Sequence, residues 1–313
     1  MRKIYIVNIN INGGNIVENN MAIEYPMFCY QCEQTAGGKG CTKMGVCGKT
    51  PEVAALQDLL IYQIKGISCY AKELVEKGEN VDKDIVSFIE DTLFTTLTNV
   101  NFDADVHVEM LKKSQKIKEA LRSKVGSIKN NTDHATYNLS DTKAEMLKDA
   151  KKAGIMYDQN LDPDIRSLRQ TIIYGLKGIS AYGHQARALG YYDDQVDNFY
   201  VRALEATTDD NLDVEELIRW TMRTGDMSVA VMKKLDEANT TVYKNPSPQK
   251  VNVHVKKGPF IIVSGHDLKD LDMLLKQTEG KGINIYTHGE MIPSHGYPEL
   301  KKYPHLVGNF GGA

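Results

Sequence analysis

Four of the five cysteines of the chain lie in one short segment, residues 28–47, which reads FCYQCEQTAGGKGCTKMGVC. Their spacing is Cys29-x2-Cys32-x8-Cys41-x5-Cys47. Iron–sulfur clusters are held by thiolates, and a Cys-x-x-Cys pair lets one turn supply two of them. Glycines between the cysteines let the backbone fold closely around a cluster and direct amide hydrogens toward sulfur. This cysteine segment therefore predicts a metal centre, and its spacing favours an iron–sulfur cluster.

Two other chemistries stay open for these four thiols. A structural zinc site usually has two closely spaced pairs, and the five residues between Cys41 and Cys47 fit that pattern less well. Disulfides are typical of small secreted proteins, whereas this chain is long and we expect no signal peptide at its start. The fifth cysteine, Cys69, lies in a repeated helical segment where the other copy has Ala181, so we interpret it as a small core residue.

A second candidate site follows two expected strands. Residues 259–263 and 283–286 read as parallel strands, and they are followed by His266 and Glu290. Ligands bind beyond the carboxyl ends of parallel strands, and imidazole and carboxylate both bind iron. Other interpretations stay open, because a single His or Glu at a strand end is commonly a surface residue. Asp267 is expected to cap the next helix, and His288 and His295 compete for the ligand role.

The composition places no strong constraint on partners. The chain has 313 residues, a formal net charge of −3 and 42% hydrophobic residues, as expected for a globular protein with more than one core. The balanced charge indicates neither a nucleic-acid partner nor an anionic membrane surface. No apolar run approaches the length of a membrane span. We therefore expect a cytoplasmic protein.

A sequence repeat begins directly after the cysteine segment. Residues 50–78 align without gaps onto residues 162–190, and both copies contain the block Ile-Tyr-x-x-Lys-Gly-Ile-Ser-x-Tyr. Each copy begins with a capping residue followed by proline and ends at glycine, which is the pattern of one long helix. Lys65 and Lys177 are equivalent positions in the block, so we interpret them as structural. We likewise expect the tyrosines of the block to lie in the core.

Further helices are expected after each copy. The predicted ranges are 82–99 and 103–122 after the first copy, and 193–207 and 212–239 after the second. The sequence thus predicts two three-helix units related by duplication. A polar loop, 126–140, separates them, and Thr142 with Glu145 has the spacing of a capping box.

The pattern changes after the prolines at 246 and 248. Residues 251–255 and 259–263 read as strands, residues 267–278 as an amphipathic helix and residues 283–286 as a strand, which is the order of a parallel βαβ unit.

The fold class expected is therefore mainly α followed by α/β, with duplicated three-helix bundles and an incomplete Rossmann-like parallel domain. We expect a disordered extension at 1–26, a helical domain at 27–245 that carries the cysteine segment, and a truncated α/β domain at 246–313.

Two stretches resemble the hybrid-cluster protein family, also called prismane proteins or hydroxylamine reductases. They are MFCYQCEQTAGGKGCTKMGVCGKTPEVAALQDLL and GHDLKDLDMLLKQTEGKGINIYTHGEMIPSHGYPELKKYPHLVGNFGGA, and the resemblance covers residues 27–313. It implies a [4Fe-4S] cluster on Cys29, Cys32, Cys41 and Cys47. It also implies a second, mixed iron–sulfur–oxygen cluster, for which the family's histidine and glutamate fall on His266 and Glu290.

For a complete protein, the resemblance implies reduction of hydroxylamine to ammonia, with nitric oxide as a related substrate and a soluble protein as electron donor. In the family, further cysteines and another glutamate complete the mixed cluster downstream of the region present here. We therefore expect the 313 residues to be a fragment that does not hold the mixed cluster and is inactive alone. The alternatives are a non-catalytic [4Fe-4S] electron-transfer module and a zinc-stabilised helical interaction domain.

Overall fold

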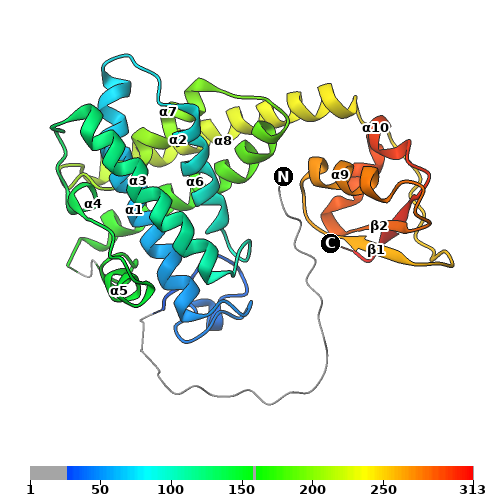
Figure 1. Cartoon of the computed structure of the whole chain (residues 1–313), viewed down its shortest axis with the longest axis horizontal. Helices are drawn as coiled ribbons and strands as arrows, with labels where there is room; N and C mark the ends of the chain where they lie inside the picture. Colours follow the sequence, from blue (N-terminus) through cyan, green and yellow to red (C-terminus); the bar gives the residue numbers. More distant parts are fainter. Residues whose placement is uncertain (1–26, 158–159, 313) are drawn as a thin grey trace.

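The structure is a computed structural model that describes residues 27–157 and 160–312. The extension predicted for residues 1–26 lies outside the described residues. A helical part comes first and a small α/β part follows it, as Figure 1 shows. The helices of the first part are α1 (Pro51–Glu76), α2 (Lys83–Thr95), α3 (Ala104–Val125), α4 (Asp133–Thr136), α5 (Lys143–Asp149), α6 (Pro163–Ala188), α7 (Asp194–Ala206) and α8 (Val214–Tyr243).

The two repeat copies form α1 and α6, which have the same length of 26 residues. The Thr50 hydroxyl accepts the Val53 amide hydrogen at 3.2 Å, and the Asp162 carboxylate accepts that of Asp164 at 2.8 Å. Proline follows each cap, where its missing amide hydrogen costs nothing. Gly78 and Gly190 end the helices with φ of 79° and 88°, a left-handed conformation that glycine adopts without strain.

The second helices of the two units are exchanged. Helix α1 packs against α3 from its own copy and against α7 from the other copy, while α6 packs against α8 and α2. A single apolar core therefore contains Ile67 of α1, Leu93 of α2, Leu176 of α6 and Leu204 of α7. An ion-pair network also joins helices of the two copies, since Arg187 of α6 binds Glu90 of α2 at 3.1 Å and Asp197 of α7 at 2.8 Å. Two three-helix groups are therefore present, but each contains the second helix of the other copy.

The connection between the two copies follows the sequence prediction. Residues 126–140 are mostly irregular and include only the short helix α4. Helix α5 begins after Thr142, whose hydroxyl accepts the Glu145 amide hydrogen while the Glu145 carboxylate accepts that of Thr142. The predicted capping box is thus confirmed.

The second part contains a three-stranded parallel sheet in the order β1-β2-β3. Its elements are β1 (Phe260–Val263), α9 (Leu268–Thr278), β2 (Asn284–His288), the 3-10 helix η3 (Gly289–Gly296), α10 (Pro298–Lys301) and β3 (Leu306–Phe310). Leu271, Leu275 and Ile285 are completely buried between α9 and the sheet. Phe260 and Ile262 of β1 remain exposed, so one face of the sheet is only partly covered. This arrangement confirms the predicted fold class.

The predicted strand at 251–255 is wrong, because this stretch has no strand conformation. The Asn252 side chain accepts the amide hydrogen of His254 at 3.1 Å. This hydrogen bond forms a local turn that competes with strand pairing of the backbone. Asn252 still lies beside β3, since its carbonyl accepts the Asn309 amide hydrogen at 2.9 Å. Conversely, β3 was not predicted from the sequence.

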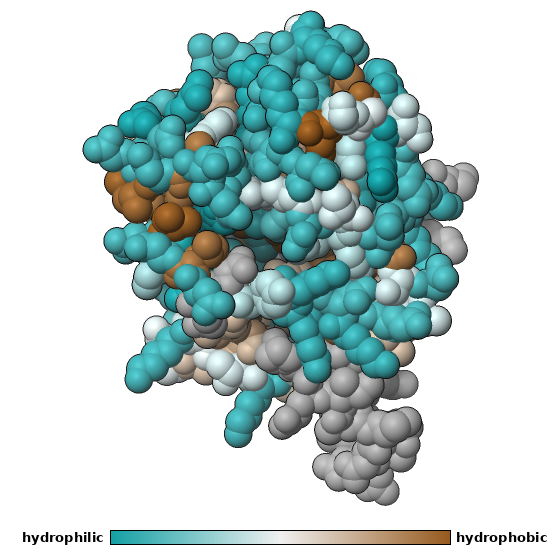
Figure 2. All heavy atoms as spheres, turned by 90° about the vertical axis from the view of Figure 1, so that its left-hand side faces the viewer, coloured by the Kyte–Doolittle hydropathy of each residue, from teal (hydrophilic) through white to brown (hydrophobic). Residues whose placement is uncertain are grey.

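Helix α8 links the two parts. It is four residues longer at its end than predicted, and its last residue, Tyr243, is buried in the α/β core with its ring 6.3 Å from that of Tyr297. The predicted domain boundary at 245/246 stays a prediction. Figure 2 shows that the face over the helical part is mostly hydrophilic, with apolar side chains in small patches. Within the described residues, every helix is too short or too polar to span a membrane.

Candidate metal centre and a second donor pair

Cys29 and Cys41 face each other across a short antiparallel bridge. The Cys29 amide donates to the Cys41 carbonyl at 3.0 Å, and the Cys41 amide donates to the Cys29 carbonyl at 2.8 Å. Residues that exchange both hydrogen bonds lie directly opposite, so their side chains project to the same face. The bridge therefore brings the first and third cysteines of the segment together although eleven residues separate them.

The Cys41 thiol is the most enclosed of the four. Its side chain is 4% exposed, and its sulfur accepts the Ala36 amide hydrogen at 3.4 Å. Hydrogen bonds from the backbone of Ala36 and Val46 lower the pKa of the Cys41 thiol, with smaller contributions from the Thr35 hydroxyl and the Lys49 ammonium. Donors that stabilise a thiolate also stabilise a thiolate–iron bond and tune its potential.

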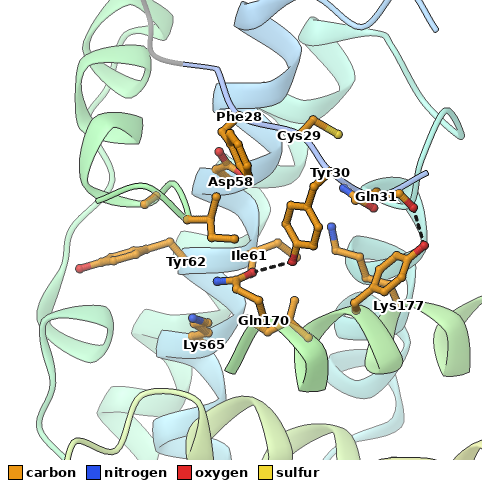
Figure 3. A pocket seen from close by; sticks show the side chains of 14 residues that line it. Phe28, Cys29, Tyr30, Gln31, Asp58, Ile61, Tyr62, Lys65, Gln170 and Lys177 are labelled. Atoms are coloured by element: carbon orange, nitrogen blue, oxygen red, sulfur yellow. Dashed lines mark hydrogen bonds between the residues drawn. The ribbon is translucent and has the colours of Figure 1, made fainter. Parts of the chain in front are cut away.

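The two residues between Cys29 and Cys32 anchor the segment to the helices. The Gln31 side chain donates to the Thr96 carbonyl at 3.2 Å and accepts the Thr98 amide hydrogen at 3.1 Å, which fixes it to the loop after α2. The Tyr174 hydroxyl of α6 donates to the Gln31 carbonyl. The Tyr30 hydroxyl donates to the Gln170 side chain at 3.3 Å, as Figure 3 shows. The Cys-x-x-Cys turn is therefore held by both halves of the repeat.

Cys47 lies at the solvent-facing end of the segment. Its side chain is exposed, while Cys29 and Cys32 are partly buried. A Cβ atom at Gly45 would lie 3.0 Å from the Cys47 sulfur and from Lys49, so a side chain here would require these neighbours to shift by a few tenths of an ångström. At Gly40, φ is +145° and a Cβ atom would lie 2.5 Å from the Phe28 ring.

The donor set fits an iron–sulfur cluster. All four thiols are free, and none is joined in a disulfide. Within residues 27–157 and 160–312, no three His, Cys, Asp or Glu side chains converge on a point where they would bind one metal ion. In a cubane each thiolate binds a different iron, so the four sulfurs surround a cluster rather than one ion. Four free thiols on one segment, with a backbone amide directed at the Cys41 sulfur, are the donor types that such a cluster uses.

A small cavity lies behind the cysteine segment, between α1 and α6. Its volume is about 60 Å³. Charged and polar groups line it, among them the Asp58 carboxyl, the Lys65 and Lys177 ammonium groups and the Tyr30 hydroxyl (Figure 3). Lys177 is 7% exposed and donates to the Thr96 carbonyl at 3.3 Å.

The structure brings His266 and Glu290 together, as expected from the strand order. Val263 of β1 lies opposite Thr287 of β2 in a parallel register, so the residues that follow both strands meet at one edge. The His266 imidazole contacts the Glu290 carboxylate directly, and each side chain is 64% exposed. This pair is therefore assembled by the sheet but is open to solvent.

The competing histidines have other surroundings. His295 is 8% exposed and its ring nitrogen lies 2.9 Å from the Thr287 hydroxyl. His288 packs beside Gly311, where a Cβ atom would lie 2.8 Å from its ring. Asp267 caps α9, as expected, by accepting the Lys269 amide hydrogen at 2.7 Å.

Cys69 is confirmed as a core residue. It is 2% exposed in the large helical core, and its sulfur lies 3.7 Å from the Thr208 hydroxyl and 3.8 Å from that of Thr132. Burial raises the pKa of its thiol. This environment is unlike that of Cys41, whose pKa is lowered.

Sequence reasoning missed the groups that support the cysteine segment. Tyr30 and Gln31 were not singled out, and the Asp58 carboxyl was overlooked. Tyr174 was expected in the core, but it is 43% exposed and anchors Gln31 instead. The repeated block was the one sequence signal that pointed to these groups. It places Lys65 and Lys177 at equivalent positions of two helices, and both residues line the same cavity in the structure.

Known proteins similar to this chain include several enzymes. A hydroxylamine reductase from Syntrophobacter fumaroxidans is 48% identical over 291 residues, covering 92% of this chain and 54% of that protein. One from Desulfitobacterium hafniense is 47% identical over 292 residues, with coverage of 92% and 52%. The chain thus spans about half the length of the curated relatives it matches. A solved carbon monoxide dehydrogenase from Thermococcus sp. AM4 aligns with 92% of this chain and 43% of its own chain, at 12% identity and with a TM-score of 0.28.

The family profile gives the broadest match. The Prismane/CO dehydrogenase family matches residues 27–313, which include the cysteine segment and both residues of the second pair. The resemblance seen in the two sequence stretches is thereby confirmed. The chain belongs to the Prismane/CO dehydrogenase family.

Proposed function

We propose that Cys29, Cys32, Cys41 and Cys47 hold a [4Fe-4S] cluster and that the chain uses it to carry single electrons. The observation that carries this proposal is the pairing of Cys29 with Cys41, together with the backbone amides directed at the Cys41 sulfur. When bound, such a cluster supplies reversible one-electron transfer. The exposed Cys47 lies where a soluble electron-donor protein would approach.

We also propose that His266 and Glu290 are two of the donors of a second, mixed iron–sulfur–oxygen cluster. Their direct contact at the ends of β1 and β2 supports this role, since two iron donors must lie side by side. The described residues offer no third His, Cys, Asp or Glu that joins them in a metal site. The remaining donors of such a cluster would therefore come from the rest of a complete protein.

The activity proposed for the complete protein is the reduction of hydroxylamine. Hydroxylamine takes up two electrons and two protons to give ammonia and water, with cleavage of its N–O bond. The names of the similar proteins and the family match support this reaction. Nitric oxide reduction is a related activity. In this proposal the protein works in the cytoplasm, His266 and Glu290 bind iron, and Cys29 to Cys47 receive the electrons.

A second candidate function is electron transfer without catalysis. It is favoured for these 313 residues because the cysteine segment is a full set of four donors, whereas the His266–Glu290 pair is an exposed set of two. In that case the chain would accept and release electrons but leave hydroxylamine unchanged.

One assay separates the two candidates. The anaerobically purified chain is mixed with a reduced viologen dye, and ammonia production is followed after hydroxylamine is added. Ammonia formation that is lost in the His266→Ala variant supports the enzyme. Dye oxidation of about one electron per chain with no ammonia supports the electron-transfer module. No dye oxidation, although iron and sulfide are present, contradicts both.

A further inference from the structure

The cavity behind the cysteine segment is built by the sequence repeat itself. Four of its lining positions on α1 have their repeat equivalents, 112 residues later, among the lining positions on α6. The pairs are Asp58 with Gln170, Ile61 with Ile173, Tyr62 with Tyr174, and Lys65 with Lys177. The cavity therefore lies where the two copies face each other, and Figure 3 shows Asp58 and Ile61 of one copy and Gln170 and Lys177 of the other below Cys29.

This cavity has the size and the lining of an internal water site. A buried water needs roughly 10–15 Å³ of such volume and two to four polar partners, so the available volume of about 60 Å³ holds a few waters. The Tyr30 hydroxyl, the Gln170 amide and the Lys177 ammonium group supply hydrogen-bonding atoms. Water in this position would join these groups to the carboxyl of Asp58.

The repeat is broken at one position that matters chemically. Asp58 is ionisable, whereas its equivalent Gln170 is not. Burial raises the pKa of the Asp58 carboxyl to about 7, although the charges of Lys177 and Lys49 oppose the shift. Burial lowers the pKa of Lys177 to about 8, opposed by the charges of Asp58 and Cys29. The cavity thus contains a carboxyl and an ammonium group whose pKa values are shifted toward each other by burial.

These groups are in electrostatic reach of the cysteine segment. Negative charge at Cys29 acts on Lys177 and opposes the effect of burial on its pKa. The other charged or titratable groups that face the site are Lys49 after the segment, Lys65 on α1 and Tyr174 on α6. Added negative charge at Cys29 favours proton binding at Asp58, because like charges disfavour the ionised carboxylate.

We propose that this cavity is a proton-binding site coupled to one-electron reduction at the cysteine segment, with the Asp58 carboxyl as the group that binds the proton. The inference rests on the cluster proposed above. A one-electron reductant supplies the electron and solvent water supplies the proton. The carboxylate becomes a carboxylic acid, and no other bond of the chain forms or breaks. Lys177, on which the charges of both Asp58 and Cys29 act, connects Asp58 electrostatically to Cys29.

The test is the midpoint potential of the cluster as a function of pH, measured by spectroelectrochemistry on anaerobic protein. We expect the potential of the parent protein to fall with rising pH around neutrality, by up to about 59 mV per tenfold change in proton concentration, the value for one proton per electron. The Asp58→Asn variant should lose at least half of this slope. Asp236→Asn, which removes an exposed carboxylate on α8, should keep the full slope.

The outcomes separate this inference from the proposed cluster. Absence of iron and sulfide from the parent protein contradicts the proposed function. A normal cluster whose potential does not vary with pH, or varies equally in Asp58→Asn, contradicts the proton site. If Asp58→Asn does not fold, infrared difference spectra of the parent protein decide. Reduction should produce the C=O band of a protonated carboxyl, and a spectrum without such a band overturns the proposal.

Discussion

The cysteine segment and the His266–Glu290 pair both gather donor groups, but the surroundings of these donors differ. In the cysteine segment, Cys41 is 4% exposed and accepts a backbone hydrogen bond, and Gln31 ties the turn to the helices. At the ends of the strands, each side chain of the pair is 64% exposed and contacts mainly the other. The cysteine segment is therefore held by hydrogen bonds to its own backbone and to the helices, whereas the His266–Glu290 pair is positioned by the ends of the strands.

This difference shows how each site depends on the rest of the chain. In the cysteine segment, a short bridge brings Cys29 and Cys41 together within one stretch of the chain. Donors that lie 24 residues apart on neighbouring strands meet only because the sheet has the right register. Metal donors must be held rigidly to be effective. We therefore expect the two regions to respond very differently to substitution.

The largest effect is expected for Cys41→Ser. Loss of the most enclosed thiolate should prevent cluster assembly, because a hydroxyl is a poor ligand for the cluster irons. Iron and acid-labile sulfide per chain should fall by at least tenfold. Cys69→Ala is the matched control, since Cys69 is a core residue and the other repeat copy has alanine there. Equal iron content in Cys41→Ser and the parent protein would refute the ligand assignment.

A smaller effect is expected from a pair of substitutions at equivalent positions of the repeat. A Cβ atom at Gly66 would lie 2.1 Å from the His134 carbonyl oxygen, whereas nothing lies within 4 Å of one at Gly178. Gly66→Ala should lower the free energy of unfolding by about 2 kcal/mol through overpacking. Gly178→Ala should raise it by up to about 1 kcal/mol through helix propensity.

Urea denaturation measures both changes in the unfolding free energy. Similar values for the two variants would show that the copies are supported alike. That result would contradict the close approach of the His134 carbonyl to Gly66.

The next effect concerns pH. The pKa of Asp58 is raised from 3.8 to about 7 in the folded protein. Between these values the folded state binds a proton that the unfolded state has released. The stabilising contribution is therefore complete below the unfolded pKa and is lost as pH rises toward 7. In Asp58→Asn, the decline in unfolding free energy over this range should be smaller than in the parent protein. Denaturation at several pH values tests this, and identical profiles would contradict it.

The smallest effect is expected at the exposed pair. Removing one partner of an exposed ion pair changes stability by less than about 1 kcal/mol. His266→Ala and Glu290→Gln should therefore leave the unfolding free energy and the iron bound to the cysteine segment nearly unchanged. Thermal unfolding and iron analysis measure both. A large loss of cysteine-bound iron in either variant would mean that the two regions are coupled more closely than their surroundings indicate.

Much of this architecture was predictable because its signals are local. The cap–proline starts and terminal glycines located α1 and α6, and alternation of strand and helix located β1, α9 and β2. The cysteine spacing located the candidate metal centre. The exchange of the second helices was not predictable, because it depends on which apolar faces meet in space and not on periodicity.

The supporting groups of the site were also hidden in the sequence. Tyr174 has the spacing of a core residue, yet its hydroxyl lies at the surface and holds Gln31. Residues 251–255 alternate like a strand, but Asn252 forms a side-chain turn that competes with strand pairing. In the sequence, Asp58 resembles an ordinary polar helix residue. Only the folded structure shows that it lines a cavity between α1 and α6.

The central claim is that four cysteines on one segment hold a four-iron cluster, and metal and sulfide analysis of anaerobically purified protein tests it most directly. The account predicts about four irons and four acid-labile sulfides per chain, with a one-electron signal in electron paramagnetic resonance after reduction by dithionite. About one zinc per chain without sulfide would contradict it.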